Sequence, residues 1–118
     1  MPRNKKPKRR KFYFRSRAGH RNENKIEKIL RERRSLDGGR VFLEVIHHAK
    51  HSKEDSNGMD FSVSRMMFGK IIWKSFGVTI SKVSRYRSRK KHKDIPCFYT
   101  PVGFDRGKFM ESVLLLFS

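Results

Sequence analysis

The stretch Ser84–Asp94, S-R-Y-R-S-R-K-K-H-K-D, holds the side chains in this sequence best suited to binding another molecule. Seven of the twelve residues 82–93 are Lys or Arg, and none is acidic. Guanidinium groups make paired hydrogen bonds with phosphates and guanine edges, whereas ammonium groups act as point charges. We therefore expect this stretch to contact nucleic acid, through Lys82, Arg85, Arg87, Arg89, Lys90, Lys91 and Lys93.

Two further groups of cations point to the same partner. One is Arg65, Lys70 and Lys74, and the other is the N-terminal set Lys5, Lys6, Lys8, Arg9, Arg10 and Lys11. The 118-residue chain has a net charge of +19, which destabilises a compact state unless a polyanion neutralises it. For a small chain this basic, nucleic acid is the commonest polyanion.

The charge is concentrated at the N-terminal end, where residues 1–34 carry 15 Lys/Arg and 3 acids. Residues 1–22 contain no acid and two prolines, so we expect a disordered basic arm followed by a single α+β domain over residues 23–118. The run Lys5–Lys11 resembles a nuclear localisation signal and predicts a nuclear location. An arm of an intracellular ribonucleoprotein or of a virion is the alternative.

Other kinds of chemistry find little support in the sequence. His47 and His51 have a spacing that can bind metal on a helix, but no glutamate follows the first of them, and the acids are scattered. We therefore expect no catalytic residues, no metal and no cofactor, and we expect that the protein is not an enzyme. Cys97 is the only cysteine, so no disulfide forms within the chain, and an intracellular location fits better.

The sequence also gives no sign of a membrane segment. No apolar run follows the basic start, as a signal peptide would require. The longest apolar stretch, V-L-L-L-F near the C-terminus, is far too short to span a bilayer. We therefore do not expect a membrane partner.

Apolar spacing predicts three helices before the basic stretch. The first covers residues 23–34, with Ile26, Ile29 and Leu30 on one face, and the second covers residues 40–53, with Phe42, Val45, Ile46 and Ala49 buried. The third covers residues 62–76, capped by Asp60 or Ser62, with Phe68, Ile72 and Phe76 in line. Gly69 would cost this third helix about 1 kcal/mol relative to alanine.

Two strands and a final helix complete the expected domain. Residues 78–85 and 95–104 are rich in β-branched and aromatic residues, which predicts a β-hairpin whose long tip is the basic stretch. Pro96 and Pro101 place the second strand at a sheet edge, or lie near the ends of that strand. Period-two spacing would direct Arg85, Arg87 and Arg89 to one face. Residues 105–117 are expected to form a short helix with Asp105 as its cap.

Helices followed by a basic hairpin match the order of elements in a winged helix. Residues 62–99 resemble the second half of winged-helix domains of the regulatory factor X type, and related domains at the C-terminal ends of viral primase–helicases. The resemblance rests on Phe68-Gly69-Lys70, Ile72 and Phe76, the basic run 82–89, and Phe98-Tyr99. It covers about a third of the chain, and the basic tip lacks the glycine usual in the family's wing. The resemblance implies that Arg85, Arg87 and Arg89 contact the major groove.

The sequence thus predicts a non-enzymatic protein that binds nucleic acid, with duplex DNA as the expected target. Another α+β fold that binds RNA is the alternative, either as a ribosomal protein or as a viral protein that binds or packages RNA. A third possibility is an interaction protein whose arm binds an acidic partner; the membrane version is disfavoured, since no basic amphipathic helix stands out. The sequence does not predict the oligomeric state.

Overall fold

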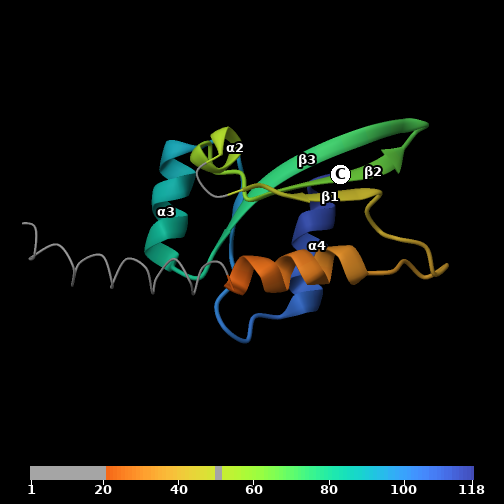
Figure 1. Cartoon of the computed structure of the whole chain (residues 1–118), viewed down its shortest axis with the longest axis horizontal. Helices are drawn as coiled ribbons and strands as arrows, with labels where there is room; N and C mark the ends of the chain where they lie inside the picture. Colours follow the sequence, from red (N-terminus) through yellow and green to blue (C-terminus); the bar gives the residue numbers. More distant parts are fainter. Residues whose placement is uncertain (1–20, 50–51) are drawn as a thin grey trace, which may run out of the picture.

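The computed structural model describes residues 21–49 and 52–118. Residues 21–32 are helical, and the elements that follow are β1 (Glu44–His47), α2 (Lys53–Ser56), β2 (Phe61–Met67), β3 (Lys70–Thr79), α3 (Lys82–Lys91), β4 (Cys97–Tyr99) and α4 (Arg106–Leu115). The described part is therefore an α+β domain, as expected (Figure 1). None of its helices is long and apolar enough to cross a membrane.

A four-stranded mixed sheet in the order β1-β2-β3-β4 forms the centre of the domain. β1, β2 and β3 are antiparallel neighbours, with Val45 opposite Val63 and Phe61 opposite Phe76. β4 pairs in parallel with the end of β3, and α3 makes the connection between them. The pairing partners share a face, so the sheet has a core face with Val45, Phe61, Val63 and Phe76 and an opposite, outward face.

The hydrophobic core lies between the core face of the sheet and two helices, the one over residues 21–32 and α4 (Figure 1). The first helix contributes Ile26 and Leu30, and α4 contributes Phe109 and Val113, all buried. Phe76, Phe98 and Phe109 pack against one another with ring centroids 5.4 to 6.2 Å apart. Both helices were expected from the sequence, and the cap on α4 is confirmed because the Asp105 side chain accepts a hydrogen bond from the Lys108 amide.

The expected helix over residues 62–76 is wrong, because these residues form the β2–β3 hairpin. Ile72 and Phe76 share one side of a helix at a spacing of four, but they also share one face of a strand, so the spacing does not separate the two structures. The β-branched and aromatic content of β3 favours the strand. Gly69 is not in a helix interior but in a two-residue turn with Phe68, and both residues have positive φ, 75° and 52°.

The expected helix over residues 40–53 is also wrong. Its centre forms β1, in which Val45 is buried and Ile46 points outward with 42% of its surface exposed. The two β-branched residues favour a strand, and Glu44–His47 pair with Phe61–Ser64 along β2. Ala49 follows the strand, and His51 lies outside the described residues.

The basic stretch is helical and the segment before it is a hairpin, which is the reverse of the prediction. The predicted hairpin with a basic tip is wrong, since residues 82–91 form α3 and β4 pairs in parallel with β3. The Ser81 hydroxyl caps α3 by accepting a hydrogen bond from the Ser84 amide. Arg and Lys favour helices over strands, and the strand signal ends at Thr79. Pro96 and Pro101 flank β4 at the sheet edge, as predicted.

Candidate nucleic-acid interface

α3 is a cationic helix that lies on the surface of the domain. Six of its ten residues are Lys or Arg, none is acidic, and none of its residues is buried. Its inner side is polar: Arg85, Ser88 and His92 are half-buried, and the Arg85 Nε donates a hydrogen bond of 3.2 Å to the Cys97 carbonyl oxygen in β4. The helix is therefore attached through polar contacts, and its charge is not offset by acidic neighbours within it.

A groove of about 520 Å³ runs along one side of α3. It is lined by Lys82, Arg85, Tyr86, Arg89, Lys90, Lys93 and Tyr99. The Lys82 ammonium lies 5.7 Å from the Tyr99 ring centroid, and the Lys90 ammonium lies 5.5 Å from that of Tyr86. Cations and aromatic faces thus alternate in one concave surface, which is the combination that proteins use for phosphate backbones and unpaired bases.

The three arginines expected on a single face do not share one. At about 100° per residue, Arg85 and Arg89 lie on the same side of a helix and Arg87 lies on the other. Arg85 and Arg89 line the groove together with Lys93, while Arg87 and Lys91 do not. The predicted period-two alternation is therefore wrong. The arginines follow helical spacing, which places Arg85 and Arg89 together in the groove and Arg87 outside it.

The other predicted cations lie away from α3. Arg65, Lys70 and Lys74 are on the core face or at the turn of the β2–β3 hairpin, and the Arg65 guanidinium packs 5.8 Å from the centre of the Phe117 ring. Since β3 rises about 3.3 Å per residue, its ten residues place Lys70 about 30 Å from the end that leads into α3. Lys5, Lys6, Lys8, Arg9, Arg10 and Lys11 lie outside the described residues.

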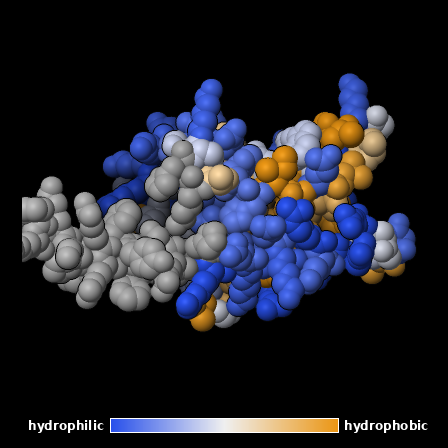
Figure 2. All heavy atoms as spheres, in the orientation of Figure 1, coloured by the Kyte–Doolittle hydropathy of each residue, from blue (hydrophilic) through white to orange (hydrophobic). Residues whose placement is uncertain are grey.

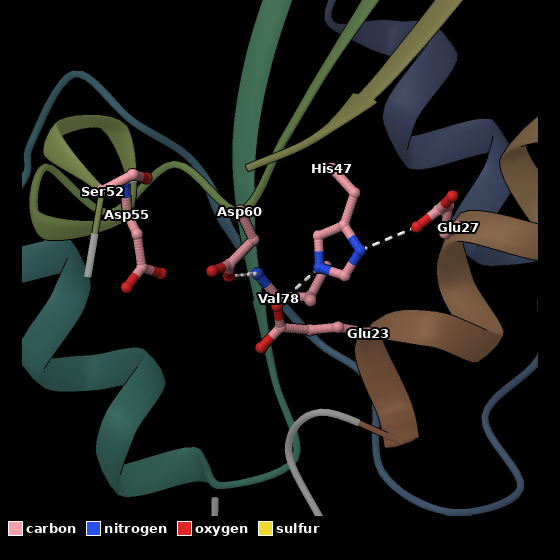
Figure 3. Close-up of polar contacts among 7 residues, drawn as sticks. All are labelled: Glu23, Glu27, His47, Ser52, Asp55, Asp60 and Val78. Carbon is pink, nitrogen blue, oxygen red and sulfur yellow. Dashed lines mark hydrogen bonds and ion pairs between the residues drawn. The ribbon is translucent and has the colours of Figure 1, made fainter. Parts of the chain in front are cut away.

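The fold also assembles a polar network from elements that are far apart in the sequence. Figure 3 shows the His47 side chain of β1 between Glu23 and Glu27 of the first helix. Its Nε2 lies 2.9 Å from a Glu23 oxygen and its Nδ1 lies 2.8 Å from a Glu27 oxygen. Burial alone would lower the pKa of His47, but the two carboxylates outweigh it and raise that pKa above its ordinary value of 6.5.

Asp60 is the most perturbed acid in the described part of the chain. Its Oδ2 accepts a 2.8 Å hydrogen bond from the Val78 amide, two residues beyond the last β3 residue that pairs with β2 (Figure 3). Burial, aided by the nearby carboxyls of Glu23 and Asp55, raises the pKa of Asp60 to about 7. The carboxyl is therefore poised between its neutral and charged forms near neutral pH.

The loop that carries Asp60 also fixes the position of α3. The Gly58 carbonyl oxygen would lie only 2.5 Å from a Cβ at Gly77, so β3 needs glycine there, and His92 at the end of α3 packs against Gly58. Cys97 is buried beneath α3, and burial raises the pKa of its thiol. α3 is thus held between this loop and β4.

Sequence reasoning missed this network, because Glu23, His47 and Asp60 come from three separate elements and have no local motif. In residues 21–49 and 52–118 no group of three or more His, Cys, Asp or Glu side chains is arranged to hold a metal ion. Tyr86 was visible in the basic stretch, but only the helix brings it beside Tyr99. Comparison with protein-family models, with curated protein sequences and with solved structures finds no match.

Proposed function

We propose that this protein binds nucleic acid without altering it chemically, and that α3 with its groove is the main contact within the domain. The observation that carries the proposal is a surface helix with six cations, no acid and no buried residue, beside a groove lined by five cations and two tyrosines. Such a helix gains little from packing, so its charge is best explained by a polyanionic partner.

Duplex DNA is the preferred target in this proposal, as the winged-helix resemblance implied, but with a helix in place of a wing. The major groove of B-form DNA is about 12 Å wide and accepts an α-helix. α3 carries cations around its circumference, so it can reach phosphates on both sides of the groove while the arginines approach base edges. The basic residues 1–20 would add contacts that are not specific for sequence.

RNA is the second candidate, and the two tyrosines of the groove favour it. Unpaired bases stack on aromatic side chains, and most recognition of RNA sequence occurs in single-stranded regions. Tyr86 is 64% exposed on the outside of α3, so a base can reach its ring. In this form of the proposal the protein is part of a ribonucleoprotein or a virion.

Competition binding of the nuclease-treated protein to duplex DNA, duplex RNA and single strands across a salt series tests the proposal. With about 6–10 phosphates engaged, affinity should fall by roughly 10³–10⁵ between 50 and 200 mM salt. Preference for duplex DNA supports the first form, and preference for single-stranded RNA that is lost in Tyr86→Leu supports the second. Absence of binding to any of them at low salt would refute both.

Two double variants with the same change in net charge show whether α3 binds through its groove. Arg89→Ala/Lys93→Ala removes two cations that line the groove, and Arg87→Ala/Lys91→Ala removes two that do not. The first should reduce the salt slope by about 2 and weaken binding more than the second. Equal losses would refute the groove as the site, and would leave contact around the whole circumference of α3 or net charge alone as the source of binding.

A further inference from the structure

The outward face of the sheet is covered at one end only. Cys97 and Tyr99 pair with Gly77 and Thr79 on this face, so α3 and the Gly58–Asp60 loop cover the end of the sheet where β3 finishes. Toward the β2–β3 turn, no described helix lies over the outward face (Figure 1).

The uncovered end of the outward face is apolar. It presents Ile46, Met66, Ile71, Trp73 and, at the turn, Phe68, with exposed fractions of 42, 56, 56, 43 and 97%. We call these five residues the apolar half-face. Register places Met66 opposite Ile71, and Trp73 opposite Ser64, which is buried. Figure 2 shows apolar residues gathered at the turn end of the sheet, in a molecule whose surface is otherwise largely hydrophilic.

The charges of the hairpin are sorted between its two faces. Arg65, Lys70 and Lys74 alternate with the apolar half-face and therefore belong to the opposite face. Among the described residues of the outward face of β1, β2 and β3, Glu44 is the only charged one. In a chain of net charge +19 this surface offers a polyanion no cation, so it does not suit nucleic acid.

We propose that the apolar half-face is where two copies of this chain pack together, sheet against sheet. A second copy necessarily supplies the same neutral apolar surface, and a two-fold pairing brings no Lys or Arg of this face against another. Phe68 and Trp73 are aromatic, a class that buries about 150–250 Å² each when covered; at their exposed fractions, these two and the three aliphatic residues together offer on the order of 500 Å² per copy. That is near the lower limit of about 1,000 Å² in total for a specific interface, so the dimer is weak and reversible.

Trp73 allows the interface to be observed directly, because it is the only tryptophan in the chain. Nuclease-treated protein is diluted from about 300 to 3 µM, a range suited to a weak interface. The buffer contains about 0.5 M salt, where the Debye length is on the order of 4 Å and repulsion between copies is screened. Sedimentation velocity measures the association state, and tryptophan emission with acrylamide quenching measures the exposure of Trp73. On dilution we expect dissociation, a red shift and stronger quenching.

Two variants with the same charge change separate the face from the rest of the surface. Ile71→Lys places a cation in the apolar half-face, and Val102→Lys does so at a residue 96% exposed in the turn before α4. Circular dichroism confirms that each variant is folded. Ile71→Lys should weaken association at least tenfold, and Val102→Lys should leave it nearly unchanged. Equal weakening by both variants would overturn the proposal.

Two other results would also overturn it. One is a wild-type chain that remains a monomer up to the highest concentration with unchanged Trp73 emission. The other is that the chain is monomeric and the Phe68→Asn substitution lowers its affinity for nucleic acid. The face would then bind nucleic acid rather than a second copy. Because the association assay contains no nucleic acid, its outcome does not depend on the function proposed above.

Discussion

Replacing Phe68 with asparagine should stabilise the domain, although it removes a large apolar side chain. Phe68 and Gly69 form the two-residue turn between Met67 and Lys70, with φ of 52° and 75°. Hairpin turns with positive φ at both central residues strongly prefer Asn-Gly, whereas a bulky residue in the left-handed region costs of order 1–3 kcal/mol. At 97% exposure the Phe68 ring contributes little packing within the monomer.

The expected gain follows from these two observations. Asparagine tolerates the left-handed conformation, so we expect Phe68→Asn to raise the free energy of unfolding by about 1 kcal/mol. For a domain of this size that corresponds to a rise in Tm of roughly 4–8 °C. The measurement is thermal and urea unfolding followed by circular dichroism at low micromolar concentration, where the proposed weak dimer would be dissociated.

Leu36→Asn is the matched control. Leu36 is also fully exposed, but Phe68 is the only non-glycine residue with positive φ in the described part of the chain. The control should therefore change stability little. If Phe68→Asn leaves Tm unchanged or lowers it, the strained turn is refuted. If both variants raise Tm equally, the gain comes from removing exposed apolar surface rather than from the backbone.

Three further predictions concern the network and α3. The raised pKa values of Asp60 and His47 mean that the folded state binds more protons than the unfolded chain, so stability should fall as pH rises from about 4 to 8. Asp60→Asn keeps an acceptor for the Val78 amide but removes the titrating carboxyl. In urea titrations at pH 5 and 8, it should reduce the difference in unfolding free energy between the two pH values by on the order of 2–4 kcal/mol. An unchanged difference would show that Asp60 is not its source. Gly77→Ala should destabilise the domain by about 2 kcal/mol or more in chemical unfolding, because the new Cβ would lie 2.5 Å from the Gly58 carbonyl oxygen. An unchanged free energy of unfolding would contradict that close approach. Amide hydrogen exchange in α3 should be fast in the free protein and slow with bound polyanion, while the exchange rate in α4 stays the same. If the α3 amides of the free protein are already as protected as those of α4, the weak attachment of α3 to the domain is contradicted.

The sequence predicts the helix over residues 21–32 and α4 well, for a physical reason. Ile26, Ile29 and Leu30 recur at i, i+3 and i+4, a spacing that a strand would not place on one face, and Asp105 marks where α4 begins. Both helices pack one apolar stripe against the sheet, so the spacing of apolar residues in the sequence predicts which of their residues are buried. The α+β class and the edge position of β4 could likewise be predicted from residue types.

The remaining elements could not be predicted, because the local pattern there is ambiguous or silent. Ile72 and Phe76 satisfy a helix and a strand equally, and only pairing with β2 decides between them. α3 has no apolar stripe at all, so periodicity gives no signal for it, and the Ser81 cap was the only local indication. The cations of the groove were predicted from composition alone, whereas the network around His47 depends entirely on tertiary structure.

The length of β3 has a consequence for any assembly that this protein builds. One continuous strand joins the apolar half-face to α3. Its half-face residues, Ile71 and Trp73, lie eight and six residues before Thr79, so the strand holds the two surfaces about 20–26 Å apart. A two-fold pairing that runs the two β3 strands antiparallel would hold the α3 helices at opposite ends, on the order of 40–50 Å apart. B-form DNA advances about 34–36 Å per helical turn, so this separation corresponds to roughly 12–15 base pairs. Duplexes shorter than that would engage one helix at a time, and the spacing between occupied sites on a longer duplex would be set by the strand rather than by the base sequence.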